Sequence, residues 1–370
     1  MMVSEYESRL AQLKQKLDEN NVNLSFITSP VNIYYLTGFY SEPHERLLAL
    51  VIDRTSEEDS LYVPSLDFEA ARENETIHSI IPISDDESPF SVIEQNNQTF
   101  ANQIGIEKKE LNVERYENLI KIYPHGQFIN IEKILTSLRL RKSDSEIKQV
   151  KQAIKVIENV LEEGLKKVSI GMTENELVAE FEYLMRLKGA EAPAFSTIVL
   201  AGSNSSLPHG TPGDNPIQRG CPLLVDMGVK VGGYCSDISR TFFIGEESKE
   251  MKNIYNTVLK ANELAIYAVE VNQSLGNIDK AARNHIHACG YGDYFNNRVG
   301  HGLGLEVHEA PSIHEQNQEK METGMVFTIE PGIYIPSLGG VRIEDDVYVK
   351  ANGDIEILTT FPKDLITLNK

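Results

Sequence analysis

Two aspartates lie in a stretch with the pattern of a β-hairpin, at positions where buried apolar residues would be ordinary. Residues 225–241 read VDMGVKVGGYCSDISRT, with alternating runs on either side of a Gly-Gly pair. A turn centred between Val231 and Gly232 would place Asp226 directly opposite Asp237, with Cβ atoms about 4.5–5.5 Å apart. Two carboxylates at that separation repel each other unless a positive charge lies between them.

A metal ion supplies that positive charge better than the nearby arginine does. Arg240 follows Asp237 by three residues, and an odd step along a strand points to the opposite face. Hard divalent cations, in contrast, take carboxylate oxygens as ligands. The hairpin therefore predicts a metal site at Asp226 and Asp237.

A second pair of acidic residues repeats this arrangement near the C-terminus. Residues 330–345 read EPGIYIPSLGGVRIED, and a turn centred on Ser337 places Glu330 opposite Glu344. Pro331 cannot donate a hydrogen bond to a strand ladder, so a bulge or an edge position is expected there. Taken alone, this pair is explained equally well by a solvated sheet edge.

Between the hairpins, the segment NRVGHGLGLEVHEAP places His301 among glycines that let backbone approach closely. Together with the two acidic pairs it makes a five-ligand, oxygen-rich set: Asp226, Asp237, His301, Glu330 and Glu344. Four carboxylates balance the charge of two divalent ions, and two metals about 3.5–4 Å apart can deprotonate one shared water. Oxygen-rich ligation favours Mn²⁺, with Co²⁺, Fe²⁺ and Zn²⁺ as alternatives.

The elements before residue 135 alternate between strands and helices, as they do in α/β folds. Helical periodicity covers residues 6–20. The expected strands cover 24–28, 46–53, 61–63, 77–83 and 103–106. We expect an N-terminal α/β domain over 1–135 and a second domain over 136–370.

The second domain shows one order of elements twice. Capping boxes at Ser143 and Thr173 predict the starts of two helices, and each helix pair precedes strands that end in an acidic hairpin. The four expected helices cover 144–167, 174–189, 248–271 and 277–289. This repeat predicts two similar halves that face each other across a cleft.

The composition excludes several classes of partner. The 370 residues carry a net charge of −20, which repels phosphate backbones and argues against nucleic acid. No run approaches the roughly 18 apolar residues of a membrane span, and the N-terminus lacks an apolar signal core. Three cysteines without a CxxC pair argue against a disulfide framework. These features predict a cytoplasmic protein.

The four motifs VDMGVKVGGYCSDISRTF, GHGLGLEVHE, TIEPGIY and VRIEDDVYV, in this order, resemble those of the pita-bread metallopeptidases. That family includes prolidase, Xaa-Pro aminopeptidase and methionine aminopeptidase, and the chain length is more similar to bacterial prolidase. The resemblance implies a creatinase-type α/β N-terminal domain and an α+β pita-bread catalytic domain with pseudo-twofold halves. It also implies a homodimer.

The resemblance assigns roles to individual residues. The five acidic and histidine residues named above match a dinuclear metal site, in which Asp237 and Glu344 match the positions that contact both metals. His209, in SLPHGTP, matches a histidine that contacts substrate, although by itself it would be read as a loop residue. His308 matches a histidine that steadies the tetrahedral intermediate, and Glu330 is expected to relay a proton to the leaving nitrogen.

Four further residues are candidates for substrate binding. Arg342 lies two residues before Glu344, hence on the same strand face, where it would orient ligand carboxylates or contact substrate. Arg298 would bind a substrate carboxylate, with a surface salt bridge as the alternative. The stretch EPHER resembles a loop of lactic-acid-bacterial prolidases that would bring His44 and Arg46 to a partner subunit's active site. A surface turn is the simpler interpretation of that stretch.

These observations predict a metallo-exopeptidase that cleaves the Xaa-Pro bond of dipeptides with a metal-bridged hydroxide. Small proline-containing peptides are the expected partners. The alternative within the family is an Xaa-Pro aminopeptidase, which acts on longer peptides. A creatinase-like hydrolase without metal and a non-catalytic peptide-binding module are further alternatives, and five intact ligands weigh against both.

Overall fold

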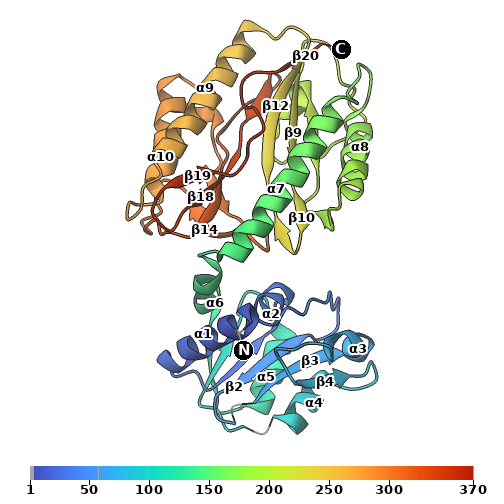
Figure 1. The fold of residues 1–370 in the computed structure, drawn as a ribbon, viewed down its shortest axis with the longest axis vertical. Coiled ribbons are helices and arrows are strands. Elements are labelled where there is room, and N and C mark those ends of the chain that lie inside the picture. The colour runs from blue at the N-terminus through green and yellow to red at the C-terminus, as the bar shows by residue number, and fades with distance from the viewer. Residues whose placement is uncertain (1–3, 57, 98, 370) are drawn as a thin grey trace. The chain divides into compact units, whose positions relative to one another are not determined.

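The computed structural model describes residues 4–56, 58–97 and 99–369. It divides the chain into two compact units, Met1–Arg139 and Leu140–Lys370 (Figure 1). The helix that covers the expected boundary region, α6 (Glu132–Arg139), belongs to the first unit. Among the residues that the structure describes, no helix combines the length and apolar character needed to cross a bilayer.

The first unit is a six-stranded mixed sheet with helices, as the α/β pattern predicted. Its strand order is β4-β3-β2-β1-β5-β6, in which the β1–β2 and β2–β3 pairs are antiparallel and the others are parallel. The strands are β1 (Leu24–Ile27), β2 (Ala49–Asp53), β3 (Asp59–Pro64), β4 (Ser79–Ile83), β5 (Gln103–Ile106) and β6 (Gln127–Asn130). Before α6 come the helices α1 (Glu5–Glu19), α2 (Pro30–Thr37), α3 (Phe68–Ala71), α4 (Pro89–Asn96) and α5 (Val113–Ile122). The sequence pattern missed β6, a short strand with no fully buried residue.

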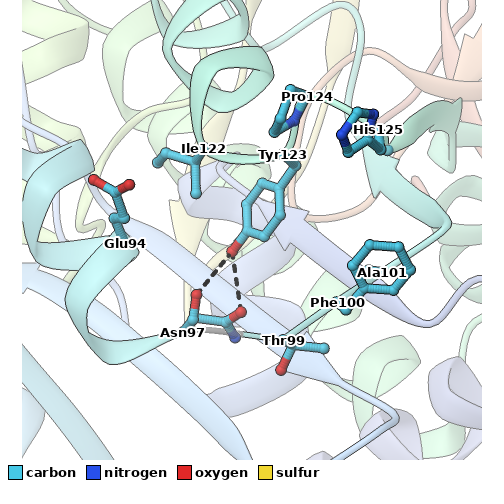
Figure 2. A pocket seen from close by; sticks show the side chains of 10 residues that line it. Glu94, Asn97, Thr99, Phe100, Ala101, Ile122, Tyr123, Pro124 and His125 are labelled. Carbon is cyan, nitrogen blue, oxygen red and sulfur yellow. Dashed lines mark hydrogen bonds between the residues drawn. The ribbon is translucent and has the colours of Figure 1, made fainter.

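A surface pocket of about 370 Å³ lies in this unit, where the chain leaves α4 and α5 (Figure 2). The Tyr123 hydroxyl points into it and hydrogen-bonds the side chain and the backbone carbonyl of Asn97, at 3.0 and 3.3 Å. Phe100 and His125 line it as well. The lining contains one carboxylate, Glu94, and therefore does not resemble a multi-carboxylate metal site.

The second unit contains two helix pairs and two main sheets, one set per half (Figure 1). The first half has helices α7 (Asp144–Leu165) and α8 (Glu174–Leu187) and strands β8 (Ile198–Ala201), β9 (Pro222–Met227), β10 (Val229–Val231), β11 (Tyr234–Cys235) and β12 (Ile238–Ile244). The second half has α9 (Lys249–Tyr267) and α10 (Gly276–Ala288) with β13 (Gly300–Gly302), β14 (Glu309–Ile313), β15 (Val326–Ile329), β16 (Gly332–Ile335), β17 (Gly339–Arg342), β18 (Asp345–Val349) and β19 (Ile355–Ile357). Short strands β7 (Ala192–Pro193) and β20 (Thr367–Leu368) extend the sheets of the first half.

Local sequence explains where the helices of the first half begin. The side chains of Ser143 and Thr173 each cap a helix and receive the reciprocal glutamate contact of a capping box, as predicted. Each half then has its own apolar core: residues of α7 and α8 pack on β8, β9 and β12, and residues of α9 and α10 pack on β15 to β18.

The register of the aspartate hairpin differs from the expected one. Asp226 lies opposite Ser239, not opposite Asp237. The two-residue turn is Gly232–Gly233, with φ of +58° and +78°, which is the type I′ geometry that favours glycine at both positions. The predicted register was therefore wrong by two residues. Because side chains alternate with a period of two, the aspartates remain on one face as diagonal neighbours.

The glutamate hairpin has the predicted register. Ile329 of β15 pairs with Asp345 of β18, and β16 and β17 continue the same pairing, which sets Glu330 opposite Glu344. Both glutamates lie where the ladder is interrupted, next to Pro331, as expected for a residue that lacks a backbone donor.

Candidate metal centre

The structure brings together side chains from three distant segments. Asp237, His301 and Glu344 each offer one ligand atom, and these atoms all lie within 4.8 Å of one another. Asp237 lies between β11 and β12, His301 lies in β13, and Glu344 lies between β17 and β18. All three are buried, so their arrangement is set by the packing of the two sheets and not by solvent.

Glu330 joins this cluster through His301. The His301 Nε2 atom lies 3.4 Å from Glu330 Oε1 and 3.8 Å from Asp237 Oδ2. The other ring nitrogen, Nδ1, lies 3.2 Å from the carbonyl oxygen of Gly302. Donation from Nδ1 to this carbonyl leaves Nε2 as the free ligand atom, which is how metal-binding histidines are commonly oriented.

Asp226 is held at the edge of the cluster by Arg342. The Nη2 atom of Arg342 donates to Asp226 Oδ2, while Nε donates to Ser239 Oγ at 2.8 Å and Nη1 to the Tyr334 hydroxyl at 2.8 Å. The guanidinium is 3% exposed at the side chain. The guanidinium therefore holds Asp226 through Oδ2, and the other carboxylate oxygen, Oδ1, is left for another partner.

The other carboxylates are supported across the two hairpins. Ser239 Oγ donates to Glu344 Oε2 at 2.9 Å, and the Glu344 backbone N–H donates to the Ser239 carbonyl at 3.1 Å. The Asp237 backbone N–H donates to Asp346 Oδ2 at 3.3 Å. Each hairpin therefore orients a ligand that belongs to the other.

Burial and mutual repulsion dominate the electrostatics. Burial, and then the neighbouring carboxylates, raise the pKa of Asp237 and of Glu344 well above their usual values. Burial also raises the pKa of Asp226, against the opposing effect of Arg342. Without a cation, these groups resist ionisation.

The unpaired oxygens show that the residues present fit a divalent metal site. Asp226 Oδ1, Asp237 Oδ1 and Glu344 Oε1 are buried and have no hydrogen-bond partner among the described residues. Buried carboxylate oxygens without a partner are costly, and metal coordination would satisfy them. Four carboxylates and one imidazole also match the ligand preferences of Mn²⁺ and similar ions.

A cavity of about 130 Å³ opens onto these ligands and contains both predicted catalytic histidines, His209 and His308. The His308 ring lies 4.3 Å from the His301 ring, centroid to centroid, in an edge-on arrangement. Burial, and then the proximity of His301 and Arg298, lowers the pKa of His308 to about 4. His308 is therefore a neutral imidazole near pH 7 and can donate one hydrogen bond into the cavity.

Arg240 lies on the opposite face of its strand, as the odd spacing from Asp237 predicted. Its guanidinium pairs with Asp345 at 2.9 Å, and both side chains are almost completely buried. Lys363 also contacts Asp345, at 2.7 Å. None of the three residues of this ion-pair cluster is among the described residues that line the cavity.

The remaining predicted substrate residues lie outside the cavity. Arg298 donates to Ser312 Oγ at 3.0 Å and is not among the described residues that line the cavity. Arg46 belongs to the N-terminal unit, where it pairs with Asp85 at 2.7 Å. His44 precedes it in the same turn, with a positive φ of 53°.

Sequence reasoning missed several residues of the site. Ser239 and Asp346 follow Asp237 and Glu344 by two residues, so strand periodicity alone could have placed them on the ligand face. No sequence pattern identified the others. They line the cavity and include Phe195, Ile198, Asn297, Val307 and Tyr334.

Known proteins share both units. Residues 148–351 match the model of metallopeptidase family M24, and residues 9–141 match the Creatinase/Prolidase N-terminal domain. A Bacillus subtilis relative, whose name provisionally assigns it as a dipeptidase, is 41% identical over 98% of this chain and 100% of its own.

Two solved structures extend the comparison. The Xaa-Pro dipeptidase from Bacillus anthracis is 32% identical, with a TM-score of 0.90 over 98% of this chain and 100% of that chain. The X-Pro aminopeptidase from Thermotoga maritima is 31% identical, with a TM-score of 0.85 over 95% of this chain and 100% of that chain. With its ordered motifs, its two hairpins and the ligand cluster between them, this chain belongs to metallopeptidase family M24 and carries the Creatinase/Prolidase N-terminal domain.

Proposed function

We propose that this metallopeptidase hydrolyses Xaa-Pro dipeptides, with two divalent cations held by the five residues predicted as ligands. One observation carries the metal-dependent part: Asp226, Asp237 and Glu344 each have a buried carboxylate oxygen without a hydrogen-bond partner among the described residues, and they line one small cavity together with His301. The substrate class is supported by the names of similar proteins, above all the Bacillus anthracis dipeptidase.

Two divalent cations would be held by these five residues and would supply a deprotonated water as the nucleophile and a positive charge for the substrate carbonyl. The chain's own residues do the remaining work. Glu330 accepts the proton of the attacking water and delivers it to the prolyl nitrogen as the C–N bond breaks. His308, neutral near pH 7, donates a hydrogen bond to the oxyanion that forms from the carbonyl oxygen. Arg342 keeps Asp226 oriented throughout.

Substrate recognition rests on shape and on few polar contacts. A prolyl nitrogen in a peptide bond has no N–H, so the site cannot select it through a hydrogen bond. The small cavity, with Phe195, Ile198 and Val307 in its wall, suits a short and partly apolar ligand. We assign the substrate contact to His209 at the cavity and the C-terminal carboxylate to Arg298, which would have to turn from Ser312.

The similarity to the Thermotoga maritima enzyme, an X-Pro aminopeptidase, favours a second candidate activity on longer peptides. Metal-free protein is reloaded with Mn²⁺, and turnover of Xaa-Pro is compared with turnover of Xaa-Pro-Xaa. We expect higher kcat/KM for the dipeptide. Preference for the tripeptide would establish the aminopeptidase instead, and an absence of metal-dependent hydrolysis of either peptide would reject both activities.

Arg298→Gln tests the carboxylate assignment in the same assay. It should raise KM for the dipeptide and leave KM for the tripeptide nearly unchanged, because only in the dipeptide does the proline itself carry the free carboxylate. Equal losses for both peptides would remove Arg298 from substrate binding.

Three finer features belong to this proposal. Mn²⁺ is the preferred metal, the protein is a cytoplasmic homodimer, and the turn with His44 and Arg46 contributes to the partner's site. Parallel reloading with Co²⁺, Fe²⁺ and Zn²⁺ ranks the metals. Sedimentation of wild type, combined with KM values for a His44→Ala variant, tests the dimer and the turn; a monomer with full activity would reject both.

A further inference from the structure

The predicted substrate histidine, His209, lies on the loop that joins β8 to β9. The chain leaves β8 at Ala201, passes a short 3-10 helix (Gly202–Ser206), and turns around His209 before it reaches β9. His209 is exposed and lines the cavity. Its local turn is closed by a single backbone hydrogen bond, from Gly210 N–H to the Leu207 carbonyl at 2.9 Å. The position of such a loop depends on anchors elsewhere.

A buried carboxylate provides those anchors. Glu174, the first residue of α8, is completely buried. Its Oε1 atom accepts the Ala201 N–H at 2.8 Å and the Asn215 side-chain amide at 3.0 Å. Its Oε2 atom accepts the Gly213 N–H at 3.0 Å. The Asn204 amide lies 3.2 Å from Oε1, so the four donors are the last residue of β8 and three residues of the loop that follows it, near both ends of that loop.

The partners of this carboxylate in the described structure are neutral N–H groups, not a cation. Hydrogen bonds to an ionised acceptor are stronger than neutral ones, and a negative charge is favourable at a helix N-terminus. Glu174 therefore holds the loop with two acceptor oxygens, each of which faces its own N–H donors. An amide at this position would present an NH₂ group to these donors.

The middle of the same loop is connected to the ligand cluster. The Pro208 carbonyl accepts a hydrogen bond from Arg342 Nη1 at 3.3 Å, and Arg342 also donates to Asp226. Ser205 Oγ accepts the Gly340 N–H of the glutamate hairpin at 2.8 Å. The loop is thus attached to α8 on one side and to the two hairpins on the other, with His209 between these attachments.

From this arrangement we infer that Glu174 is a positioning residue for His209. It acts through the loop, and sets where the imidazole stands relative to the substrate carbonyl. The inference rests on the proposed function, because His209 is placed at the substrate there. It predicts a specific signature: loss of Glu174 should matter for catalysis only while His209 is present.

A double-mutant cycle tests this signature. Glu174→Gln should lower kcat/KM for Xaa-Pro by about 10- to 100-fold, since a misplaced group of about 1 Å costs up to that factor. His209→Ala removes the imidazole, and adding Glu174→Gln to it should then change kcat/KM by less than about threefold. Bound metal should stay at the wild-type level in all variants. Losses that multiply in the double variant would overturn the proposal.

Glu146→Gln is the matched control. Glu146 is also a buried glutamate in the first turn of a helix, α7, where it accepts the Tyr234 hydroxyl and the Ser143 backbone N–H, each at 2.8 Å. Any loss it causes should be the same with and without His209. If Glu174→Gln does not fold, Asn204→Ala removes one donor from the loop and leaves the carboxylate in place. It should give a smaller loss with the same dependence on His209.

A measurement without substrate separates this inference from the proposed activity. Amide hydrogen exchange over residues 202–215 is compared in metal-loaded wild type, Glu174→Gln and Glu146→Gln. We expect faster exchange only in Glu174→Gln. Failure of wild type to cleave Xaa-Pro would reject the proposed function and leave this readout intact, whereas unchanged exchange in Glu174→Gln would reject the positioning role.

Discussion

In the aspartate hairpin, one ligand lies inside a regular ladder, with Asp226 opposite Ser239, whereas in the glutamate hairpin both ligands lie where the ladder is broken. The supports nevertheless cross between them. Arg342 of the glutamate hairpin holds Asp226, and Ser239 of the aspartate hairpin holds Glu344. Neither hairpin therefore presents a complete set of oriented candidate ligands by itself, and the candidate metal site requires both halves to be folded against each other.

The helices of the two halves show a related difference. In the first half, Glu174 holds the His209 loop with neutral donors. In the second half, Asp279, in the first turn of α10, accepts the Val299 N–H at 3.0 Å and pairs with Arg283 at 2.6 Å. Val299 lies two residues before the ligand His301. The half that carries His301, the candidate metal ligand, thus has an ion-paired anchor, whereas the anchor in the half that carries His209, the proposed substrate contact, has neutral partners.

The largest expected effect comes from removing one ligand on either hairpin. Asp237→Asn or Glu344→Gln should lower kcat by about a thousandfold or more, because metal catalysis contributes several kcal/mol to the transition state. Metal analysis should show less than the wild-type stoichiometry for each variant. Glu250→Gln, at an exposed position of α9, is the control. Full metal content in either ligand variant would show that one hairpin suffices, which would contradict the comparison.

Substitution of Arg342 or Ser239, whose hydrogen bonds cross between the two hairpins, should lower activity less than removal of a ligand does. Arg342→Lys keeps the charge but loses the fork that reaches Asp226, Ser239 and Tyr334 together. We expect a 10- to 100-fold loss of metal affinity or activity, about the range for groups that orient ligands. Ser239→Ala removes the hydrogen bond donated to Glu344 and the one accepted from Arg342 but leaves the guanidinium in place, and it should lower activity by up to about tenfold. If the lysine variant kept wild-type metal affinity, Arg342 would act only through its positive charge and not through the geometry of its hydrogen bonds.

Substitutions of the two anchoring acidic residues, Asp279 and Glu174, should differ in their effect on metal affinity. Asp279→Asn weakens an ion pair that holds the segment before His301, so metal affinity should fall by about tenfold. Glu174→Gln should leave metal affinity unchanged. Titration of the metal-free variants with Mn²⁺ measures both. Equal metal affinities in the two variants would remove the distinction between the halves.

The smallest expected effect is a pH dependence of the stability of the metal-free protein. The raised pKa values of Asp237 and Glu344 mean that the folded state binds more protons than the unfolded state above about pH 4. These two groups therefore make the free energy of unfolding decrease as pH rises, whereas the lowered pKa of His308 acts in the opposite direction up to about pH 6.5. In a His308→Ala variant, which lacks the opposing group, thermal melts after chelation should show a Tm lower by a few degrees at pH 7.5 than at pH 5.5. Added Mn²⁺ should abolish this difference, and a chelated variant that is more stable at pH 7.5 would contradict the like-charge account.

Sequence patterns predicted the parts of this protein that depend on local rules. Capping boxes placed the starts of α7 and α8, and strand periodicity placed Arg240 on the face opposite Asp237. The predicted register of the aspartate hairpin was wrong. Both glycines of the turn adopt positive φ, so the turn centre lies one residue further along the chain and the pairing differs by two residues. The shared face was still correct, since a shift of two residues preserves the alternation of side chains.

By itself, the sequence determined which side chains could bind metal and which strand faces they occupy, because spacing along a strand sets direction without reference to the rest of the fold. Only the tertiary structure decided how those side chains are oriented and charged. The contacts of Arg342 with Asp226 and of Ser239 with Glu344 join residues more than 100 positions apart, at 116 and 105. Contacts of that kind, and the burial that raises the carboxylate pKa values, exist only after the two halves have packed together.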